Sequence, residues 1–379
     1  MKLKGINTMK SASKLPLLGT GLLLAIGLTA CGSAQAGTSV VTGSAQVKTD
    51  DGLVINGETI ADKATYDKAK TETLSLYSGY TESSENALVA AFTKDTGIKV
   101  NVVRLTPNKL AERVLSEKGA GKLGADVIRT SDYRIAKSIE DAGAWQSYDV
   151  PGASAFKDVS IDGGKFTRMF DSVYTIGYNT QLVKAADAPK SWADVVDGKW
   201  QGKLGIVQGG SGGSTAALNR FMESKLGPEY FQSYSSQKPT IYDSLGAEAT
   251  ALARGEVAVG TVTISGTNIS AVQDKAPVKF VVPEEGLVAY DYFLGMTSSA
   301  KNSEAAKVFM NYNFSKQGQK VFAQIGEYPA RTDMAPPTIM GVQLPTIDSG
   351  KVYRMTNADA ISSGKDDLAK WNKVFGYTK

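Results

Sequence analysis

A glycine-rich loop is the stretch of this 379-residue chain whose residue types are best suited to chemistry. It reads Gly209-Gly210-Ser211-Gly212-Gly213-Ser214 and lies between an apolar segment, 205–207, and a segment with helical spacing. Glycine lets a backbone approach another molecule closely. The first N–H groups of a helix favour an anion or another strong acceptor. The loop therefore predicts a binding surface for a small polar ligand, and a flexible surface loop is the alternative.

The same loop resembles three enzyme motifs, and each lacks a required residue. Residues 209–213 fit the G-x-S-x-G nucleophile elbow, but the chain has no histidine to serve as the base of a Ser-His-acid triad. A phosphate-binding P-loop needs a lysine, and a dinucleotide loop needs a third glycine where Thr215 stands. Two S-x-x-K matches, at Ser235 and Ser298, lack the S-D-N and K-T-G patterns that accompany them in enzymes. We expect no catalytic residues, with a serine hydrolase as an alternative function.

Charge and composition exclude several other classes of protein. The chain has 42 basic and 38 acidic residues, and four of the lysines lie before Cys31, so the rest has 42 − 4 = 38 of each sign. A balanced body argues against nucleic-acid binding, which needs a basic surface. One cysteine and no histidine exclude most zinc and non-haem iron sites. We therefore expect no metal site, no cofactor and no nucleic-acid partner.

The N-terminal segment predicts export from the cytoplasm. Lys10 and Lys14 precede an apolar run that is short for a membrane span and typical of a secretory signal. The run ends in Leu28-Thr29-Ala30-Cys31, which resembles the lipobox of bacterial lipoproteins. That resemblance implies a signal peptide over 1–30, an acylated Cys31, and an extracytoplasmic protein held at the bacterial membrane. Residues 31–72 are expected to form a tether and an N-terminal extension.

From residue 73 onward, predicted strands and helices alternate, which favours a parallel sheet covered by helices. Ligands of such sheets bind beyond the carboxyl ends of the strands. Polar turns follow predicted strands at 78–81, 129–132 and 264–268, and the glycine-rich loop is a fourth. Four such turns in two α/β units predict a ligand cleft. The candidate ligand-binding residues are Ser78, Tyr80, Thr81, Arg129, Thr130, Ser131, Gly210, Ser211, Gly212, Ser214, Ser265 and Thr267.

Two arginines could add positive charge to this cleft. Arg129 lies in the second polar turn and Arg168 precedes another predicted strand, 172–178. A guanidinium suits a phosphate or carboxylate because it can donate two parallel hydrogen bonds. A solvated arginine that lies along the surface is the alternative.

Six segments carry a family resemblance: Leu76-Tyr77-Ser78-Gly79, 92–100, Ala125-Asp126-Val127, 192–194 with 199–205, Gly255-Glu256-Val257 and Glu327-Tyr328-Pro329-Ala330-Arg331. On these segments, residues 73 to about 333 resemble the solute-binding proteins of bacterial ABC importers, in the branch that contains ferric-ion-binding proteins. The resemblance implies an α/β, two-lobed periplasmic binding protein fold and delivery of a ligand to a membrane permease. It implies lobe 1 over 73–170 and 286–335, lobe 2 over 171–285, and C-terminal helices over 336–379.

The ligand implied by this resemblance is not a bare iron ion. Ferric-binding members use a histidine, a glutamate and two adjacent tyrosines, and the aligned positions here hold Thr81, Ser131, Ser265 and Gly266. Neutral hydroxyls replace anionic oxygen donors poorly. We expect a phosphate ester, a phosphonate, a carboxylate or a polyol, captured by lobe closure. Iron(III) bound through a synergistic anion is an alternative, and so is a surface adhesion or scaffold protein without a small ligand.

Overall fold

The computed structural model describes residues 39–152, 155–156, 160–161 and 163–378. The predicted signal peptide and Cys31 lie outside these residues. Within the described ranges, none of the helices combines the length and the apolar character needed to cross a membrane.

The N-terminal extension is a small folded unit packed on the rest of the protein. Its elements are β1 (Val47–Lys48), β2 (Leu53–Ile55), β3 (Glu58–Ala61) and α1 (Lys63–Ala69). Asn56 and Gly57 turn the chain between β2 and β3 with φ of 52° and 84°, as their Asn-Gly sequence predicts. The Asn311 side chain donates a 2.8 Å hydrogen bond to the Ile60 carbonyl, so the extension is tied to a helix far along the chain.

Lobe 1 contains the first α/β alternation. Its elements are β4 (Thr73–Ser78), α2 (Glu82–Thr96), β5 (Lys99–Arg104), α3 (Pro107–Gly119), β6 (Val127–Ser131) and α4 (Tyr133–Asp141). β4 pairs in parallel with β5 and with β6, which confirms the predicted parallel sheet. Because β4 and β6 are neighbours, the chain segments that follow Ser78 and Ser131 leave the same edge of the sheet.

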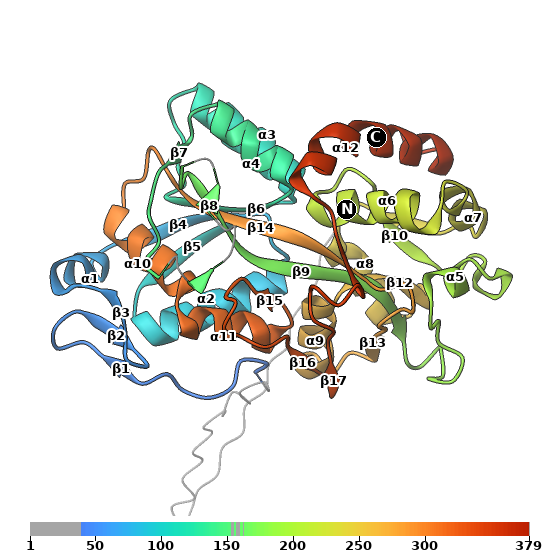
Figure 1. The fold of residues 1–379 in the computed structure, drawn as a ribbon, viewed down its shortest axis with the longest axis horizontal. Coiled ribbons are helices and arrows are strands. Elements are labelled where there is room, and N and C mark those ends of the chain that lie inside the picture. The colour runs from blue at the N-terminus through green and yellow to red at the C-terminus, as the bar shows by residue number, and fades with distance from the viewer. Residues whose placement is uncertain (1–38, 153–154, 157–159, 162, 379) are drawn as a thin grey trace, which may run out of the picture. The chain divides into compact units, whose positions relative to one another are not determined.

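Two long antiparallel strands connect the lobes. β9 (Phe166–Asn179) and β14 (Leu287–Thr297) pair with each other and cross the centre of Figure 1 between lobe 1 on the left and lobe 2 on the right. β14 also pairs with β6 of lobe 1, and β9 pairs with β12 (Val259–Thr263) and β13 (Val278–Phe280). These strands make one continuous sheet through both lobes.

Lobe 2 contains the second alternation. Its helices and strands are α5 (Trp192–Val195), β10 (Gly205–Val207), α6 (Gly213–Phe221), α7 (Tyr230–Ser236), β11 (Thr240–Tyr242), α8 (Leu245–Arg254), β12, α9 (Ile264–Val272) and β13, with short turns of helix at Gly198–Trp200 and Met222–Leu226. One prediction is wrong here. Residues 264–268, expected as a polar turn, form the first turns of α9, because the Thr263 hydroxyl caps that helix by accepting from the Gly266 N–H at 3.1 Å.

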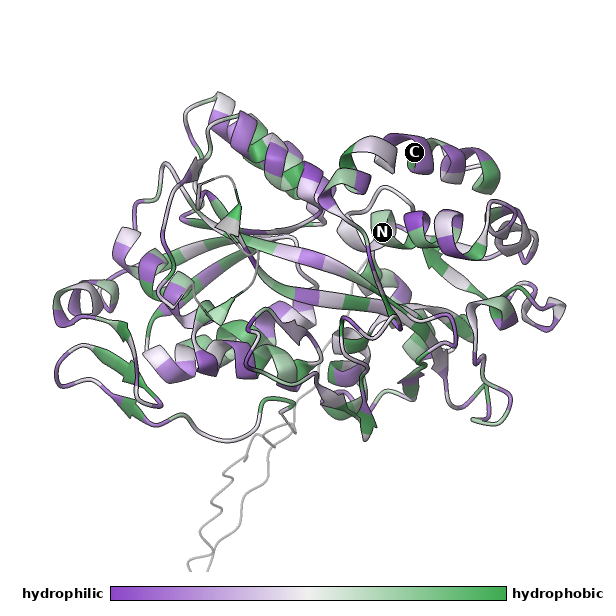
Figure 2. Cartoon of the chain, in the orientation of Figure 1, coloured by the Kyte–Doolittle hydropathy of each residue, from purple (hydrophilic) through white to green (hydrophobic). Residues whose placement is uncertain are grey.

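The remaining elements complete lobe 1 and the C-terminus. They are β7 (Trp145–Gln146), β8 (Ser160–Ile161), α10 (Ser303–Phe314), α11 (Lys316–Ile325), β15 (Tyr328–Pro329), β16 (Thr338–Ile339), β17 (Val342–Gln343), β18 (Val352–Arg354) and α12 (Asn357–Phe375). The segment 336–379 was expected to form helices; its described residues, 336–378, hold three short strands and one helix, α12. Figure 2 shows hydrophilic and hydrophobic residues alternating along α12, as in a helix that buries one face.

Candidate functional site

The glycine-rich loop leads directly into α6, as predicted. Gly212 is the N-cap residue of this helix. The Thr215 hydroxyl reaches back to it, accepting from the Gly212 N–H at 3.3 Å and donating to the Gly212 carbonyl at 3.0 Å. Ser214 lies within the first turn, whose N–H groups have no partner inside the helix. The hydroxyls of Ser211 and Ser214 therefore lie beside the N-terminus of α6, where the Gly212 N–H is already bonded to the Thr215 hydroxyl.

Close neighbours on both sides explain why this loop is glycine. A Cβ at Gly212 would lie 2.7 Å from Pro107 Cγ, and one at Gly213 would lie 2.6 Å from the Asp132 nitrogen, both in lobe 1. On the opposite side, a Cβ at Gly209 would lie 2.8 Å from Trp371 Cδ2 in α12. Cβ atoms do not approach other heavy atoms this closely. The loop is thus held between lobe 1 and the C-terminal helix.

Ser131 and Asp132 make the matching surface on lobe 1. The Gly213 N–H donates to the Ser131 hydroxyl at 3.2 Å, which joins the lobes. Asp132 has φ of 77°, a conformation that non-glycine residues rarely adopt and that clusters at functional positions. Its carboxylate accepts from the Arg134 N–H at 2.9 Å and from the Arg134 guanidinium at 2.6 Å and 3.0 Å. Asp132 was not among the predicted site residues, and its strained backbone leaves no signal in the sequence.

A second contact between the lobes centres on Tyr80. Its hydroxyl donates to the carboxylate of Glu327 and lies 3.4 Å from the hydroxyl of Ser265 in lobe 2. The Tyr80 ring packs edge-on against Tyr292, with ring centroids 4.8 Å apart. Burial raises the pKa of Glu327 to about 7, and burial together with the Glu327 charge raises the pKa of Tyr80 well above its usual value. Glu327 carries part of the family resemblance in the sequence, but nothing in the sequence indicates its contact with Tyr80.

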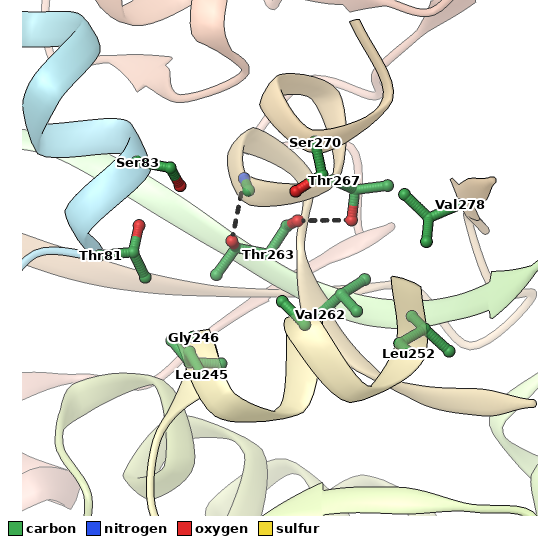
Figure 3. A pocket seen from close by; sticks show the side chains of 12 residues that line it. Thr81, Ser83, Leu245, Gly246, Leu252, Val262, Thr263, Thr267, Ser270 and Val278 are labelled. Atoms are coloured by element: carbon green, nitrogen blue, oxygen red, sulfur yellow. Dashed lines mark hydrogen bonds between the residues drawn. The ribbon is translucent and has the colours of Figure 1, made fainter. Parts of the chain in front are cut away.

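Thr81 and Thr267 line a pocket between the lobes (Figure 3). The cavity has a volume of about 40 Å³ and shares Thr81, Ser83 and Ser270 with a wider groove of about 890 Å³. The Thr81 hydroxyl is buried and has no hydrogen-bond partner among the described residues. The Thr267 hydroxyl donates to the Thr263 carbonyl at 2.9 Å. Leucine and valine side chains form the opposite wall, so this pocket offers hydroxyls on one side and apolar surface on the other.

Three predicted residues lie inside lobe 1 rather than at the cleft. Arg129 is fully buried, pairs with the Glu85 carboxylate, and donates to the Asn313 side chain at 3.0 Å. The Ser78 hydroxyl donates to the same Glu85 carboxylate, and the Thr130 hydroxyl donates to the Ser131 carbonyl at 3.1 Å. These groups are bonded within the core of lobe 1, and their contact with a ligand stays a prediction. The other arginine considered, Arg168, pairs with Asp171 at 2.8 Å.

Gly210 lies at the outer end of the cleft. Its N–H donates to the Gln208 side chain at 2.9 Å, and it lines a groove of about 610 Å³ with α3 and α12 residues that include Lys109 and Asn372. The structure therefore brings Tyr80, Thr81, Ser131, Gly210, Ser211, Gly212, Ser214, Ser265 and Thr267 to the junction of the lobes. Among the described residues, no group of three or more His, Cys, Asp or Glu side chains is arranged to hold a metal ion.

Comparison with known proteins identifies the family. Residues 87–346 match the family of bacterial extracellular solute-binding proteins. The chain belongs to this family. A Salmonella paratyphi A protein named for 2-aminoethylphosphonate binding is 25% identical over 296 residues, which cover 75% of this chain and 85% of that protein.

Solved structures show the same two-lobed fold. Iron-bound HitA from Pseudomonas aeruginosa superposes with a TM-score of 0.62 at 22% identity, covering 80% of this chain and 99% of HitA. AfuA from Actinobacillus pleuropneumoniae, with fructose-6-phosphate bound, gives a TM-score of 0.64 at 19% identity, covering 81% of this chain and 99% of AfuA. The predicted family, the fold class and the function of capturing a small solute for an ABC importer are confirmed. Members of this family are binding proteins that act outside the cytoplasm. This chain therefore has an extracytoplasmic location and an ABC permease as its partner.

Proposed function

We propose that this solute-binding protein is anchored to the membrane through Cys31 and binds, without chemical turnover, a small solute that carries a phosphonate or phosphate group. The lobes that close on it are 73–170 with 286–335, and 171–285. The observation that carries the proposal is the glycine-rich loop at the start of α6, which meets Ser131 of lobe 1 across the cleft. The positive end of the α6 dipole, together with the hydroxyls of Ser211 and Ser214, suits a tetrahedral anion.

The charges around the cleft favour the same class of ligand. Arg129 and Arg168 are engaged by Glu85 and Asp171, so the α6 N-terminus supplies the positive potential for the anion. Neutral hydroxyls at Thr81, Ser131 and Ser265 stand where an iron site needs anionic oxygen donors. The relative named for 2-aminoethylphosphonate and the AfuA complex with fructose-6-phosphate support a ligand with a phosphorus-centred anion.

Alanine at Ser214 is expected to weaken binding of such a ligand by about 10- to 100-fold, because a hydrogen bond to a charged group contributes about 1.5–3 kcal/mol. Isothermal titration calorimetry with 2-aminoethylphosphonate, fructose-6-phosphate and inorganic phosphate measures the change. Ser211→Ala tests the second hydroxyl of the loop. Ser233→Ala, an exposed serine in α7, is the matched control and should bind as the wild type does. Unchanged affinity in both loop variants would place the anion elsewhere, and binding of polyols but of no phosphorus anion would refute the ligand class.

The lipid anchor is tested separately from the ligand. We expect the wild-type protein to enter the detergent phase on phase separation of cell extracts, and Cys31→Ser to leave it, because acylation needs the thiol. Mass spectrometry of the N-terminal peptide should find the acyl mass in the wild type alone. Ser33→Ala, which keeps the cysteine, is the control. A wild-type protein that stays in the aqueous phase would contradict the anchor and leave the ligand proposal unaffected.

A further inference from the structure

The C-terminal helix α12 lies beyond the residues matched by the family, 87–346, yet it forms one side of the glycine-rich loop. Trp371 is fully buried and stacks on Phe375, with ring centroids 4.5 Å apart. Its indole lies against Gly209, and Leu368 lies 3.5 Å from the Cβ position of Gly210. On the other side, Pro107 and Asp132 of lobe 1 pack against the loop. The position of the loop therefore depends on α12.

Ion pairs hold α12 on lobe 2. Asp367 of α12 lies 3.3 Å from the guanidinium of Arg220 in α6. Lys370 lies 2.6 Å from the carboxylate of Glu223, which follows α6. With these pairs and the buried Trp371 against Gly209, α12 is packed on lobe 2.

α12 also meets lobe 1, where Asn357 and Ala360 line a pocket with Asp132 and Tyr133, and the tightest approach is at Gly364. A Cβ at Gly364, in the middle of the helix, would lie 2.9 Å from Cζ of Arg134 in α4. The guanidinium of Arg134 thus occupies the space that a side chain at residue 364 would fill. Glycine inside a helix is less favourable than alanine by about 1 kcal/mol, and its lack of a side chain is what admits the arginine here.

We call the space beside Gly364 the notch. Arg134, which occupies the notch, is bound by Asp132 at the cleft. The Asp132 carboxylate binds the Arg134 guanidinium through two hydrogen bonds, and the Asp132 nitrogen is the atom closest to the Cβ position of Gly213. The same short segment of lobe 1 therefore meets both the glycine-rich loop and α12. Hinge opening that moves lobe 1 from the loop also withdraws Arg134 from Gly364.

We propose that α12 is a closure latch: Arg134 of lobe 1 enters the notch at Gly364 when the lobes close, and this contact favours the closed conformation. The latch adds a conformational control to the proposed function. It rests on that function only for the identity of the ligand that the closed lobes enclose. A protein whose lobes close partly without ligand pays less conformational free energy on binding, so the latch also raises ligand affinity.

The test measures the distance between the lobes with and without ligand. Spin labels are attached at Lys122→Cys in lobe 1 and Ser233→Cys in lobe 2, both exposed positions, in a Cys31→Ser background. Gly364→Leu fills the notch with a residue of higher helix propensity than glycine. Without ligand, we expect its short-distance population to fall about threefold, and its affinity for 2-aminoethylphosphonate to fall by the same factor, about threefold, because apparent affinity scales with the closed fraction. Ser362→Leu, on the exposed face of α12, adds the same side chain and should leave both unchanged.

A second variant keeps the latch testable if Gly364→Leu unfolds. Arg134→Ala removes the side chain that enters the notch, and it should shift the distances in the same direction. The double variant should shift them no further, because both changes break one contact. Wild-type distances in Arg134→Ala, or in folded Gly364→Leu, would overturn the latch. A wild type that does not bind 2-aminoethylphosphonate or any phosphorus anion would count against the proposed ligand, while the distances without ligand still decide the latch.

Discussion

Replacing Gly213 with alanine is expected to weaken ligand binding by about 100-fold, or about 2.7 kcal/mol, without unfolding the protein. The added Cβ would lie 2.6 Å from the backbone nitrogen of Asp132 and 3.0 Å from Ser131 Cβ. A backbone atom cannot move aside as the tip of a long side chain can, so the lobes must stay apart. The closed conformation loses its contact at the loop, and the ligand loses the surface that lobe 1 adds.

The same substitution suits the open conformation. Gly213 is the first residue of α6 and does not have positive φ, so alanine fits its backbone and has the higher helix propensity. Calorimetric titration should show the loss of affinity, while thermal unfolding stays within a few degrees of the wild type. Gly119→Ala, at the end of α3 with no atom within 4 Å of its Cβ position, is the matched control. Wild-type affinity in Gly213→Ala would show that binding does not need the approach of Asp132 to the loop.

The lobe 1 sheet could be predicted because its local signals agree. β4, β5 and β6 are short strands separated by helices, and Gly97 ends α2 in the left-handed conformation. The crossover strand β9 was predicted only in part, over 172–178. Buried polar residues such as Thr167, Arg168 and Asp171 interrupt its apolar pattern, and Figure 2 shows hydrophilic bands along both crossover strands. Tertiary partners such as the Arg168–Asp171 pair stabilise these residues, and a sequence does not reveal them.

The candidate site shows the same division between local and tertiary information. The glycines of residues 209–213 predicted that other groups approach the loop backbone closely, and the structure contains such approaches. The sequence does not identify these groups, which are Pro107, Asp132 and Trp371. The turn at 264–268 was misread because serine, glycine, threonine and asparagine are weak helix formers. Burial of Ile264 and Ile269, with the Thr263 cap, outweighs that preference.

Arg129 is buried against Glu85, a partner that the sequence does not reveal. Its loss is expected to have the largest effect on stability. Arg129→Met is expected to lower the free energy of unfolding by about 3–5 kcal/mol, because it leaves the Glu85 carboxylate buried without its cation. Glu85 is 1% exposed, and its other hydrogen bond in the core comes from Ser78. In the sequence, Glu85 stands in a helix with many polar residues, where nothing marks it as buried.

Removing both charges should restore most of the lost stability. In the double variant Glu85→Gln with Arg129→Met, the neutral amide still bonds to Ser78, and methionine packs beside Phe309, over whose ring the guanidinium lies at 5.6 Å. Urea unfolding followed by tryptophan fluorescence gives the free energies, and titration of the folded variants gives their affinities. We expect each folded variant to bind within about twofold of the wild type, because the guanidinium faces the lobe 1 core. A stable Arg129→Met that no longer binds the anion would instead make this arginine a ligand contact, as its place in the polar turn first indicated.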